Sequence, residues 1–312
     1  MHAIALDMGG TFLKSAIVSN DGEIVQESFY KVPSFSNCSK NVIIENMLNT
    51  LRVQIKRAKE LHMKIEGIGI GIPGPADYEK GILYIPPRLN KYQSIYGVSL
   101  KDEIIEHLNI SNVKFELDSF LFLRGENWLG AARNFSRVIG ITLGTGLGSA
   151  FMINGKIVVD ETITPPEGWI GGLAYKDGIV EDVISARWIV REYKKLKGID
   201  KDFEVEEIAY FAERGDRICQ RIFEELGENL SLVLEPIALR FRPDAIVFGG
   251  QISKSFKLFE NTLKSGLSQL PFPIKIRTAK YIDLSSLYGA AYLIFSNYQD
   301  QSQNDSSHNQ PT

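Results

Sequence analysis

Short apolar runs separated by turn residues open the chain. Residues 3–6 read AIAL, a second apolar run occupies residues 14–19, and a third extends over residues 24–30. Runs of this length bounded by Gly, Asn or Asp predict β-strands. The segment DMGGT at 7–11 forms the turn between the first two runs, and NDG at 20–22 is typical of a hairpin turn before the third.

A helical periodicity follows these strands. From Ser39 onward apolar residues recur every three or four positions, which predicts an amphipathic helix. Residues 65–72, IEGIGIGI, form an extended run that stops at Pro73-Gly74-Pro75. Residues 69–74 match the dinucleotide-binding spacing G-x-G-x-x-G, but the glycines of that motif open a helix, whereas the first two here lie inside a predicted strand. We interpret this match as coincidental.

The second half of the chain repeats the layout of the first. Strands are predicted at 138–142, 150–153 and 156–159, with a glycine turn at 144–148 and a hairpin turn at 154–155. Self-similarity of this kind is a fold-level signal, and it favours two related α/β lobes. The alternative is that two β-hairpins with glycine turns arose independently, which is common in α/β proteins.

Composition narrows the class of protein. The 312 residues are 44% hydrophobic, so the chain can bury a sizeable core, and its length favours two domains. A formal net charge of −3 disfavours generic nucleic-acid binding. Two cysteines far apart fit a reducing compartment. Because no signal peptide or membrane span is recognisable, we expect a cytoplasmic protein. The polar segment 297–312 predicts a disordered tail.

The two glycine turns are candidate phosphate-binding loops. Backbone amides in such turns can converge on a phosphate because no side chain blocks the approach. Gly9-Gly10-Thr11 and Gly144-Thr145-Gly146 each combine these amides with a threonine hydroxyl, and Asp7 offers a carboxylate for hydrated Mg²⁺. A single turn of this kind is more often a simple hairpin, so the functional interpretation depends on the pair. The sequence contains no Walker A motif.

Five motifs, in the same order along residues 3–295, resemble the ROK (repressor, ORF, kinase) family of sugar kinases and regulators. They are DMGGT at 7–11, IGIPGPAD at 70–77, LGTGLGSA at 143–150, IVFGGQIS at 246–253 and SLYGAAYL at 286–293. The resemblance implies an actin-like fold of the sugar kinase, Hsp70 and actin group, with duplicated ribonuclease-H-like lobes. It also implies ATP and Mg²⁺ as ligands, a sugar substrate and a homodimer.

The resemblance assigns roles to individual residues. Asp118, in ELDSFLFLRGE, corresponds to the catalytic base, Glu167 to the glutamate that holds the sugar ring and Glu181 to a second sugar-facing glutamate. Without the resemblance, both glutamates would be interpreted as surface carboxylates. The expected nucleotide-binding residues are Asp7, Gly9, Gly10, Thr11, Lys14, Gly144, Thr145, Gly146, Gly148, Gly249 and Gly250. The expected substrate-binding residues are Gly74, Asn90, Asp118, Glu167, Trp169 and Glu181, and Asp7 is the expected Mg²⁺ ligand.

The sequence departs from the family pattern at residues that the resemblance assigns to sugar binding. Trp169 stands where the family has a histidine, and no Cys or His follows between Gly171 and Glu181, so we expect no zinc site. Leu117 replaces the asparagine that usually precedes the base, and the usual Asn-Leu-x-x-Trp segment is altered at 87–92. Trp169 is therefore expected to shift the sugar preference.

These observations lead to a two-lobed α/β protein, with residues 1–117 as the first lobe, 118–296 as the second and 297–312 as the tail. An alternative is that the last helix packs back against the first lobe. The expected activity is transfer of the γ-phosphoryl group of ATP to a hydroxyl of a hexose or hexose derivative, with Asp118 as the base. The alternative is a non-catalytic sugar sensor related to the family's repressors. A DNA-binding repressor is disfavoured, because the first strand begins near residue 3 with no basic segment ahead of it.

Overall fold

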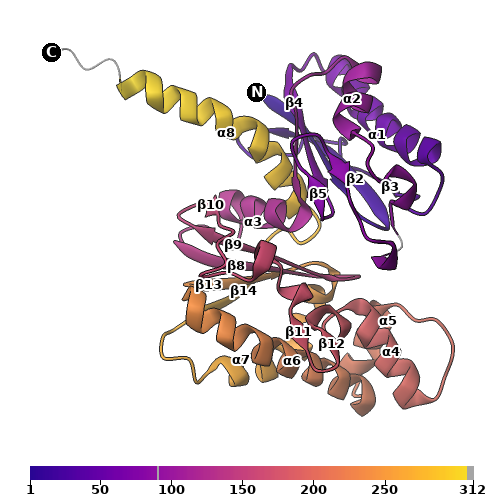
Figure 1. Ribbon diagram of the computed structural model, residues 1–312, viewed down its shortest axis with the longest axis vertical. Coiled ribbons are helices and arrows are strands. Elements are labelled where there is room, and N and C mark those ends of the chain that lie inside the picture. Colours follow the sequence, from indigo (N-terminus) through magenta and orange to yellow (C-terminus); the bar gives the residue numbers. More distant parts are fainter. Residues whose placement is uncertain (90, 308–312) are drawn as a thin grey trace. The chain divides into compact units, whose positions relative to one another are not determined.

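The computed structural model describes residues 1–89 and 91–307 (Figure 1). Its backbone divides into two compact units. The first unit comprises Met1–Leu129 together with Leu284–Thr312, and the second comprises Gly130–Asp283. Each unit contains a five-stranded sheet with its own hydrophobic core. None of the helices in the described part of the chain is both long and apolar enough to cross a membrane.

The sheet of the first unit has the order β3-β2-β1-β4-β7. Its strands are β1 (His2–Met8), β2 (Phe12–Ser19), β3 (Tyr30–Pro33), β4 (Ile65–Ile72) and β7 (Val113–Leu117). β1 pairs antiparallel with β2, whereas β1, β4 and β7 are parallel. The prediction of a strand over residues 24–30 was wrong. Ile24 forms only an isolated bridge to Val18, and Glu27 has a φ of 59°, a left-handed conformation that interrupts an extended run.

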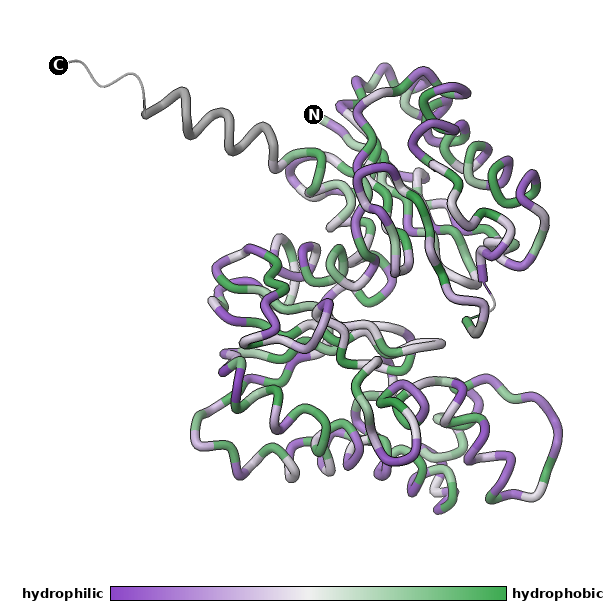
Figure 2. Tube along the Cα trace, in the orientation of Figure 1, coloured by the Kyte–Doolittle hydropathy of each residue, from purple (hydrophilic) through white to green (hydrophobic). Residues whose placement is uncertain are grey.

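Helices cover both faces of this sheet. α1 (Lys40–Glu60) and α2 (Leu100–Leu108) pack beside the cluster that contains Ile4, Leu6 and Met8 of β1. Figure 2 shows the alternation of hydrophobic and hydrophilic residues along α1. α3 (Asp118–Leu129) and α8 (Ser285–Ser307) pack together, and α8 contacts β1 and β4. The short strands β5 (Ala76–Asp77) and β6 (Ile82–Leu83) form a separate hairpin in the same unit.

The alternating Ile and Gly residues of β4 lie on opposite faces of the sheet. Ile68, Ile70 and Ile72 belong to the cluster beside α1. On the opposite face, a side chain at Gly69 would collide with the backbone of Ala290 in α8, and one at Gly71 would lie 3.0 Å from Leu121 in α3. Successive residues of a strand point to opposite faces, so the glycines allow α3 and α8 to approach the sheet closely.

The second unit repeats the sheet of the first. Its order, β10-β9-β8-β13-β14, has the same mixture of antiparallel and parallel pairs. The strands are β8 (Arg137–Leu143), β9 (Leu147–Ile153), β10 (Lys156–Ile157), β13 (Ala245–Gly249) and β14 (Lys275–Thr278). The duplication predicted from the sequence is therefore confirmed.

Helices on one side of this second sheet enclose the larger hydrophobic cluster (Figure 1). They are α4 (Ala186–Lys197), α5 (Val205–Glu213), α6 (Arg217–Phe241) and α7 (Glu260–Leu267). Between β10 and α4 the chain forms short 3₁₀ turns at Pro166–Gly168, Ile170–Gly172 and Val180–Asp182, and a small hairpin of β11 (Ala174–Tyr175) and β12 (Gly178–Ile179).

The boundary between the compact units lies later than the expected 117/118. The reason is the packing of α3 against α8. A side chain at Gly125 of α3 would collide with the backbone of Ser285, and one at Gly289 of α8 would collide with that of Leu121, so the two helices touch through their glycines. α3 with Asp118 therefore belongs to the first unit.

The end of α8 also differs from the expected tail. The helix extends to Ser307, into the segment 297–312, while residues 308–312 lie outside the described residues. Residues 297–307 contain neither Gly nor Pro, the residues that most strongly interrupt a helix.

Candidate active site

Two carboxylates meet at the carboxyl ends of parallel strands in the first unit. Asp7 lies near the end of β1, and Asp118 directly follows β7 as the first residue of α3. Between these strands, a Cβ atom placed on Gly71 of β4 would lie 3.7 Å from the Asp7 Oδ1 atom and 3.8 Å from the Asp118 Cα atom. Because Gly71 has no side chain, α3 can pack closely here, and its Leu121 side chain lies 3.0 Å from the same position. Ligands of open α/β sheets bind at this edge.

The pKa of Asp118 is shifted by its surroundings. Burial raises the pKa of its carboxyl group, and the Lys91 ammonium and a hydrogen bond from the Ser119 amide to Oδ1, 2.7 Å long, oppose that rise. This hydrogen bond holds the carboxylate at the start of α3. A carboxylate whose pKa is moved toward neutrality accepts a proton more readily than an ordinary surface aspartate.

The pKa of the Asp7 carboxyl group is also raised toward neutral pH. Burial raises the pKa of Asp7 to about 6, the Lys14 ammonium lowers it, and the negative charge of Asp118 raises it. Lys14 lies directly opposite Asp7 in the register of β1 and β2, so the two side chains share one face of the sheet. The register of the hairpin thus places two of the predicted nucleotide-binding residues next to each other.

The first glycine turn is held through its carbonyl groups. The Tyr92 hydroxyl donates to the Gly9 carbonyl at 2.7 Å, and the hydroxyls of Ser34 and Ser36 donate to the Gly10 carbonyl at 2.7 and 2.6 Å. In a trans peptide the carbonyl and the following N–H point in opposite directions. The amides that follow, of Gly10 and Thr11, are therefore directed away from these side chains, as a phosphate-binding turn requires.

Sequence reasoning missed these supporting residues. Tyr92 is 0% exposed, and burial raises the pKa of its hydroxyl, so it remains a donor. Lys91 approaches the same turn: a Cβ atom on Gly10 would lie 3.4 Å from the Lys91 Cδ atom. Both residues lie in the segment 87–92. The departure of this segment from the family pattern is the sequence feature that could have pointed to them. Of the other sugar-side residues predicted in this unit, Gly74 lies in the loop after β4, and Asn90 lies outside the described residues.

The second glycine turn joins β8 to β9 in the second unit. A Cβ atom on Gly144 would meet no atom within 4 Å, so the turn is open there, and Thr145 is exposed. Within the turn, the Gly144 amide donates to the Gly146 carbonyl at 3.0 Å. A side chain at Gly146 would collide with the carboxylate of Glu181, which explains the need for glycine. Gly148 continues into β9, where it pairs with Thr142.

The three predicted sugar contacts of the second unit have different surroundings. Glu167 is exposed, with a φ of 55°. Glu181 is 8% exposed and accepts from the Leu147 amide at 2.9 Å, while its other oxygen pairs with Arg187 at 2.6 Å. Trp169 donates its indole N–H to the Leu147 carbonyl at 2.9 Å. Glu181 and Trp169 therefore both contact the glycine turn.

The predicted adenosine loop also borders this turn. Gly249 ends β13, and Gly250 follows with a φ of 81°. A side chain at Gly250 would collide with the backbone of Leu143, the last residue of β8. The loop after β13 and the glycine turn after β8 thus lie side by side at one end of the second sheet.

The chemistry of the first site fits Mg²⁺. This ion usually binds through one or two carboxylates, with water and substrate phosphates completing its shell. Asp7 offers such a carboxylate, and a cation beside it would offset the burial and the nearby Asp118 charge that raise its pKa. Within the described residues, no group of three or more His, Cys, Asp or Glu side chains could hold a metal ion.

We predict that purified protein contains no stoichiometric zinc. A structural zinc site needs four clustered Cys or His ligands, whereas the chain has two Cys and four His, spread along its length. Elemental analysis after dialysis against a chelator checks this expectation. One zinc ion per chain that survives dialysis would contradict it.

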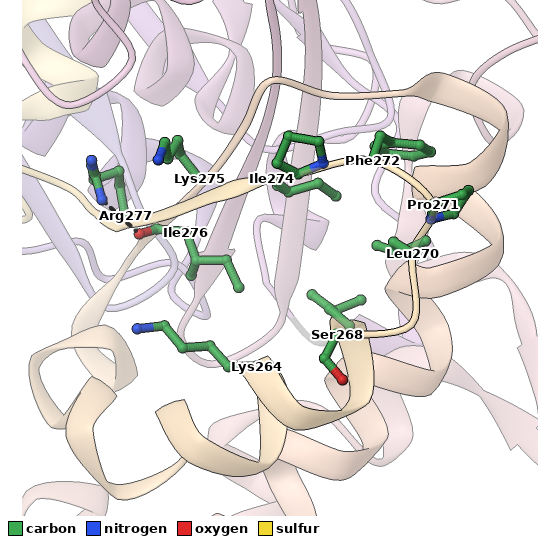
Figure 3. Close-up of a pocket in the computed structure, with 11 residues that line it drawn as sticks. Lys264, Ser268, Leu270, Pro271, Phe272, Ile274, Lys275, Ile276 and Arg277 are labelled. Atoms are coloured by element: carbon green, nitrogen blue, oxygen red, sulfur yellow. Dashed lines mark hydrogen bonds between the residues drawn. The ribbon is translucent and has the colours of Figure 1, made fainter.

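A hollow of about 600 Å³ lies apart from all the predicted site residues. It is formed between α7 and β14 and is lined by residues that include Lys264, Phe272, Lys275 and Arg277 (Figure 3). In Figure 3 the proline-rich connection from Leu270 to Ile274 closes one side. None of the predicted nucleotide or sugar residues lines it, so this hollow is not the candidate active site.

Comparison with known proteins shows the family of this chain. The chain matches the ROK family over residues 3–297. A glucokinase of Thermotoga maritima is 24% identical, over 94% of this chain and 97% of the relative. A xylose repressor of Caldicellulosiruptor bescii is 23% identical, over 94% of this chain and 78% of the relative.

A solved structure has the same fold. The crystal structure of a ROK family glucokinase from Streptomyces griseus in complex with glucose and AMPPNP matches with a TM-score of 0.74 and 24% identity, over 94% of this chain and 99% of that one. The predicted resemblance and fold class are confirmed: the chain belongs to the ROK family and has the two-lobed, actin-like α/β fold of its sugar kinases.

Proposed function

We propose that this protein transfers the γ-phosphoryl group of ATP to a hydroxyl of a hexose or hexose derivative. The observation that carries the proposal is the placement of Asp118 beside Asp7 and Gly71, at the carboxyl ends of three parallel strands. A sugar hydroxyl is a poor nucleophile until its proton is removed, and the Asp118 carboxylate is the proposed acceptor.

The remaining residues bind and orient the two substrates. Mg²⁺, when bound at Asp7, would neutralise charge on the phosphate oxygens. The amides of Gly10 and Thr11 in the first unit, and the turn Gly144–Gly146 with the loop at Gly249–Gly250 in the second, are the proposed phosphate and nucleotide contacts. Glu167 is proposed to accept hydrogen bonds from the sugar, because carboxylates bind hydroxyl donors strongly.

A screen of sugars tests this function. ADP release is measured with hexoses and N-acetyl sugars in a coupled assay, and thermal shifts are recorded with the same compounds. We expect ATP-dependent turnover of at least one sugar, which also stabilises the protein. Sugar-induced stabilisation without turnover of any sugar would instead favour a non-catalytic sensor, and the absence of both would overturn the proposal.

Lys91 is expected to set the acid limit of activity. Its positive charge holds the pKa of Asp118 below the value that burial alone would produce. In Lys91→Met the pKa of Asp118 should therefore rise, and since only ionised Asp118 accepts the proton, the acid side of the kcat profile should move to higher pH. Lys91→Arg keeps the charge and serves as the control. An unchanged acid limb in Lys91→Met would contradict this role.

We also propose a homodimer in the cytoplasm, as the family resemblance implies. Light scattering coupled to size-exclusion chromatography measures the mass of the particle directly. A mass near the 35.0 kDa of one chain at micromolar concentration would count against the dimer.

A further inference from the structure

The backbone of Leu147 is held on both sides by side chains from distant parts of the second unit. Its amide donates to Glu181 Oε2 at 2.9 Å, and its carbonyl accepts from Trp169 Nε1 at 2.9 Å. Leu147 is 3% exposed, and the hydrogen bond from its amide to Glu181 is buried. Leu147 directly follows Gly144–Gly146, and fixing its peptide groups fixes the end of that turn.

Trp169 is itself fixed in place. Cβ atoms on Gly171 and Gly172 would lie 2.5 Å from its indole Nε1 and Cε3 atoms, so the ring packs directly on the two glycines. The Ser149 hydroxyl ties the same segment to β9, because it donates to the Gly168 carbonyl at 2.7 Å and accepts from the Ile170 amide at 2.9 Å.

Glu181 is fixed in the same way from the other side. Arg187 of α4 pairs with its second oxygen at 2.6 Å, and its carboxylate occupies the space that a side chain at Gly146 would need. The start of α4 adds a third connection, a hydrogen bond of 2.9 Å from the Ala186 amide to the Gly144 carbonyl. The turn is thus supported at both of its ends.

We infer that Trp169 and Glu181 are positioning residues that hold the nucleotide-binding turn through the two sides of Leu147, and that Trp169 does not select the sugar. This inference rests on the proposed function, since it assumes that Gly144–Gly146 binds the nucleotide. It replaces the expectation from the sequence that Trp169 shifts sugar preference, because the single N–H donor of the indole is already bonded to the turn.

The variant Trp169→Phe tests the role of the indole N–H group. Phenylalanine keeps an aromatic ring over the two glycines but removes the N–H, leaving the Leu147 carbonyl unpaired. We expect affinity for a non-hydrolysable ATP analogue to fall by about five- to tenfold, the usual effect of losing one hydrogen bond within a protein. The KM for sugar and the ranking of hexoses should stay unchanged. Trp128→Phe, the same change in α3 of the first unit, should leave nucleotide affinity within about twofold.

Glu181 provides a second, independent variant. Glu181→Ala should weaken nucleotide binding, and Glu181→Gln should recover part of the loss because its amide oxygen can still accept from the Leu147 amide. Equal loss in both variants would contradict the positioning role of Glu181.

Hydrogen–deuterium exchange separates this inference from the proposed function. In the protein without ligand, the peptide containing residues 144–148 should exchange faster in Trp169→Phe than in the wild type, whether or not the protein proves to be a kinase. Unchanged exchange would overturn the inference. A changed hexose ranking in Trp169→Phe with unaltered nucleotide affinity would also overturn it, and would place Trp169 at the sugar instead.

Discussion

Asp118→Asn is expected to lose about 10²–10⁴-fold in kcat, the usual contribution of a general base. Asparagine has the shape of aspartate but cannot take the proton from the attacking hydroxyl. Nucleotide affinity should stay near that of the wild type, because the proposed nucleotide contacts are backbone groups of the two glycine turns. Steady-state kinetics, combined with calorimetric titration of a non-hydrolysable ATP analogue and of the sugar, separates loss of chemistry from loss of binding.

A matched control for this variant lies in the hairpin turn of the same unit. Asp21→Asn makes the same chemical change at an exposed position and should leave kcat unaltered. If Asp118→Asn kept more than about a tenth of the wild-type kcat, another acid would have to serve as base. Glu116 would be the next candidate from the sequence, but both its oxygens pair with Arg124, at 2.6 and 2.8 Å, so it is poorly placed to accept a proton.

The duplicated fold was predictable because it follows from local patterns. The strand, glycine turn and strand arrangement occurs in both halves of the sequence, and the two sheets have the same strand order. The return of the last helix to the first lobe was among the alternatives drawn from the sequence, but the residues through which α8 meets α3 were not, because that contact joins residues far apart in sequence. Gly125 and Gly289 each look like ordinary helix glycines until the two helices are seen to touch.

In the candidate site, too, contacts between residues far apart in sequence could not be predicted. Asp7 was predicted from its glycine turn and Asp118 from the family resemblance, and the register of β1 with β2 brings Lys14 beside Asp7. The partner of Trp169 could not be identified in this way. Its hydrogen bond to Leu147 depends on how the segment after β10 folds back over β9, and a tryptophan in a loop carries no local signal of its acceptor.

Asp7→Asn is expected to make the ligand-free protein more stable while removing most of its activity. Burial raises the pKa of Asp7 from 3.8 to about 6, so the folded protein holds a proton that the unfolded chain releases between these values. The free energy of unfolding therefore falls as pH rises from about 4 to about 6, by about 3 kcal/mol, and stays lower above that. Asparagine has no charge to bury, so the variant escapes this loss.

Thermal unfolding at several pH values measures the effect. The melting temperature of Asp7→Asn should exceed that of the wild type at pH 7 and approach it near pH 4. Asp216→Asn supplies a control of opposite sign, because the hydrogen-bonded Lys197 ammonium lowers the pKa of Asp216. That carboxylate stabilises the fold at neutral pH and loses its contribution as the pH falls through its own pKa, so its removal should lower the melting temperature at pH 7.

Adding ligand should reverse the order of wild type and Asp7→Asn. A bound Mg²⁺ ion provides the opposite charge that the buried carboxylate lacks, so Mg²⁺ with a non-hydrolysable ATP analogue should raise the melting temperature of the wild type more than that of the variant. An equal rise in both proteins would show that Asp7 is no metal ligand. A lower stability of the ligand-free variant at pH 7 would contradict the unfavourable burial of the charge. Higher stability of the ligand-free variant, together with a larger ligand-induced rise in the wild type, would identify Asp7 as a carboxylate that destabilises the free protein and binds a cation in the complex.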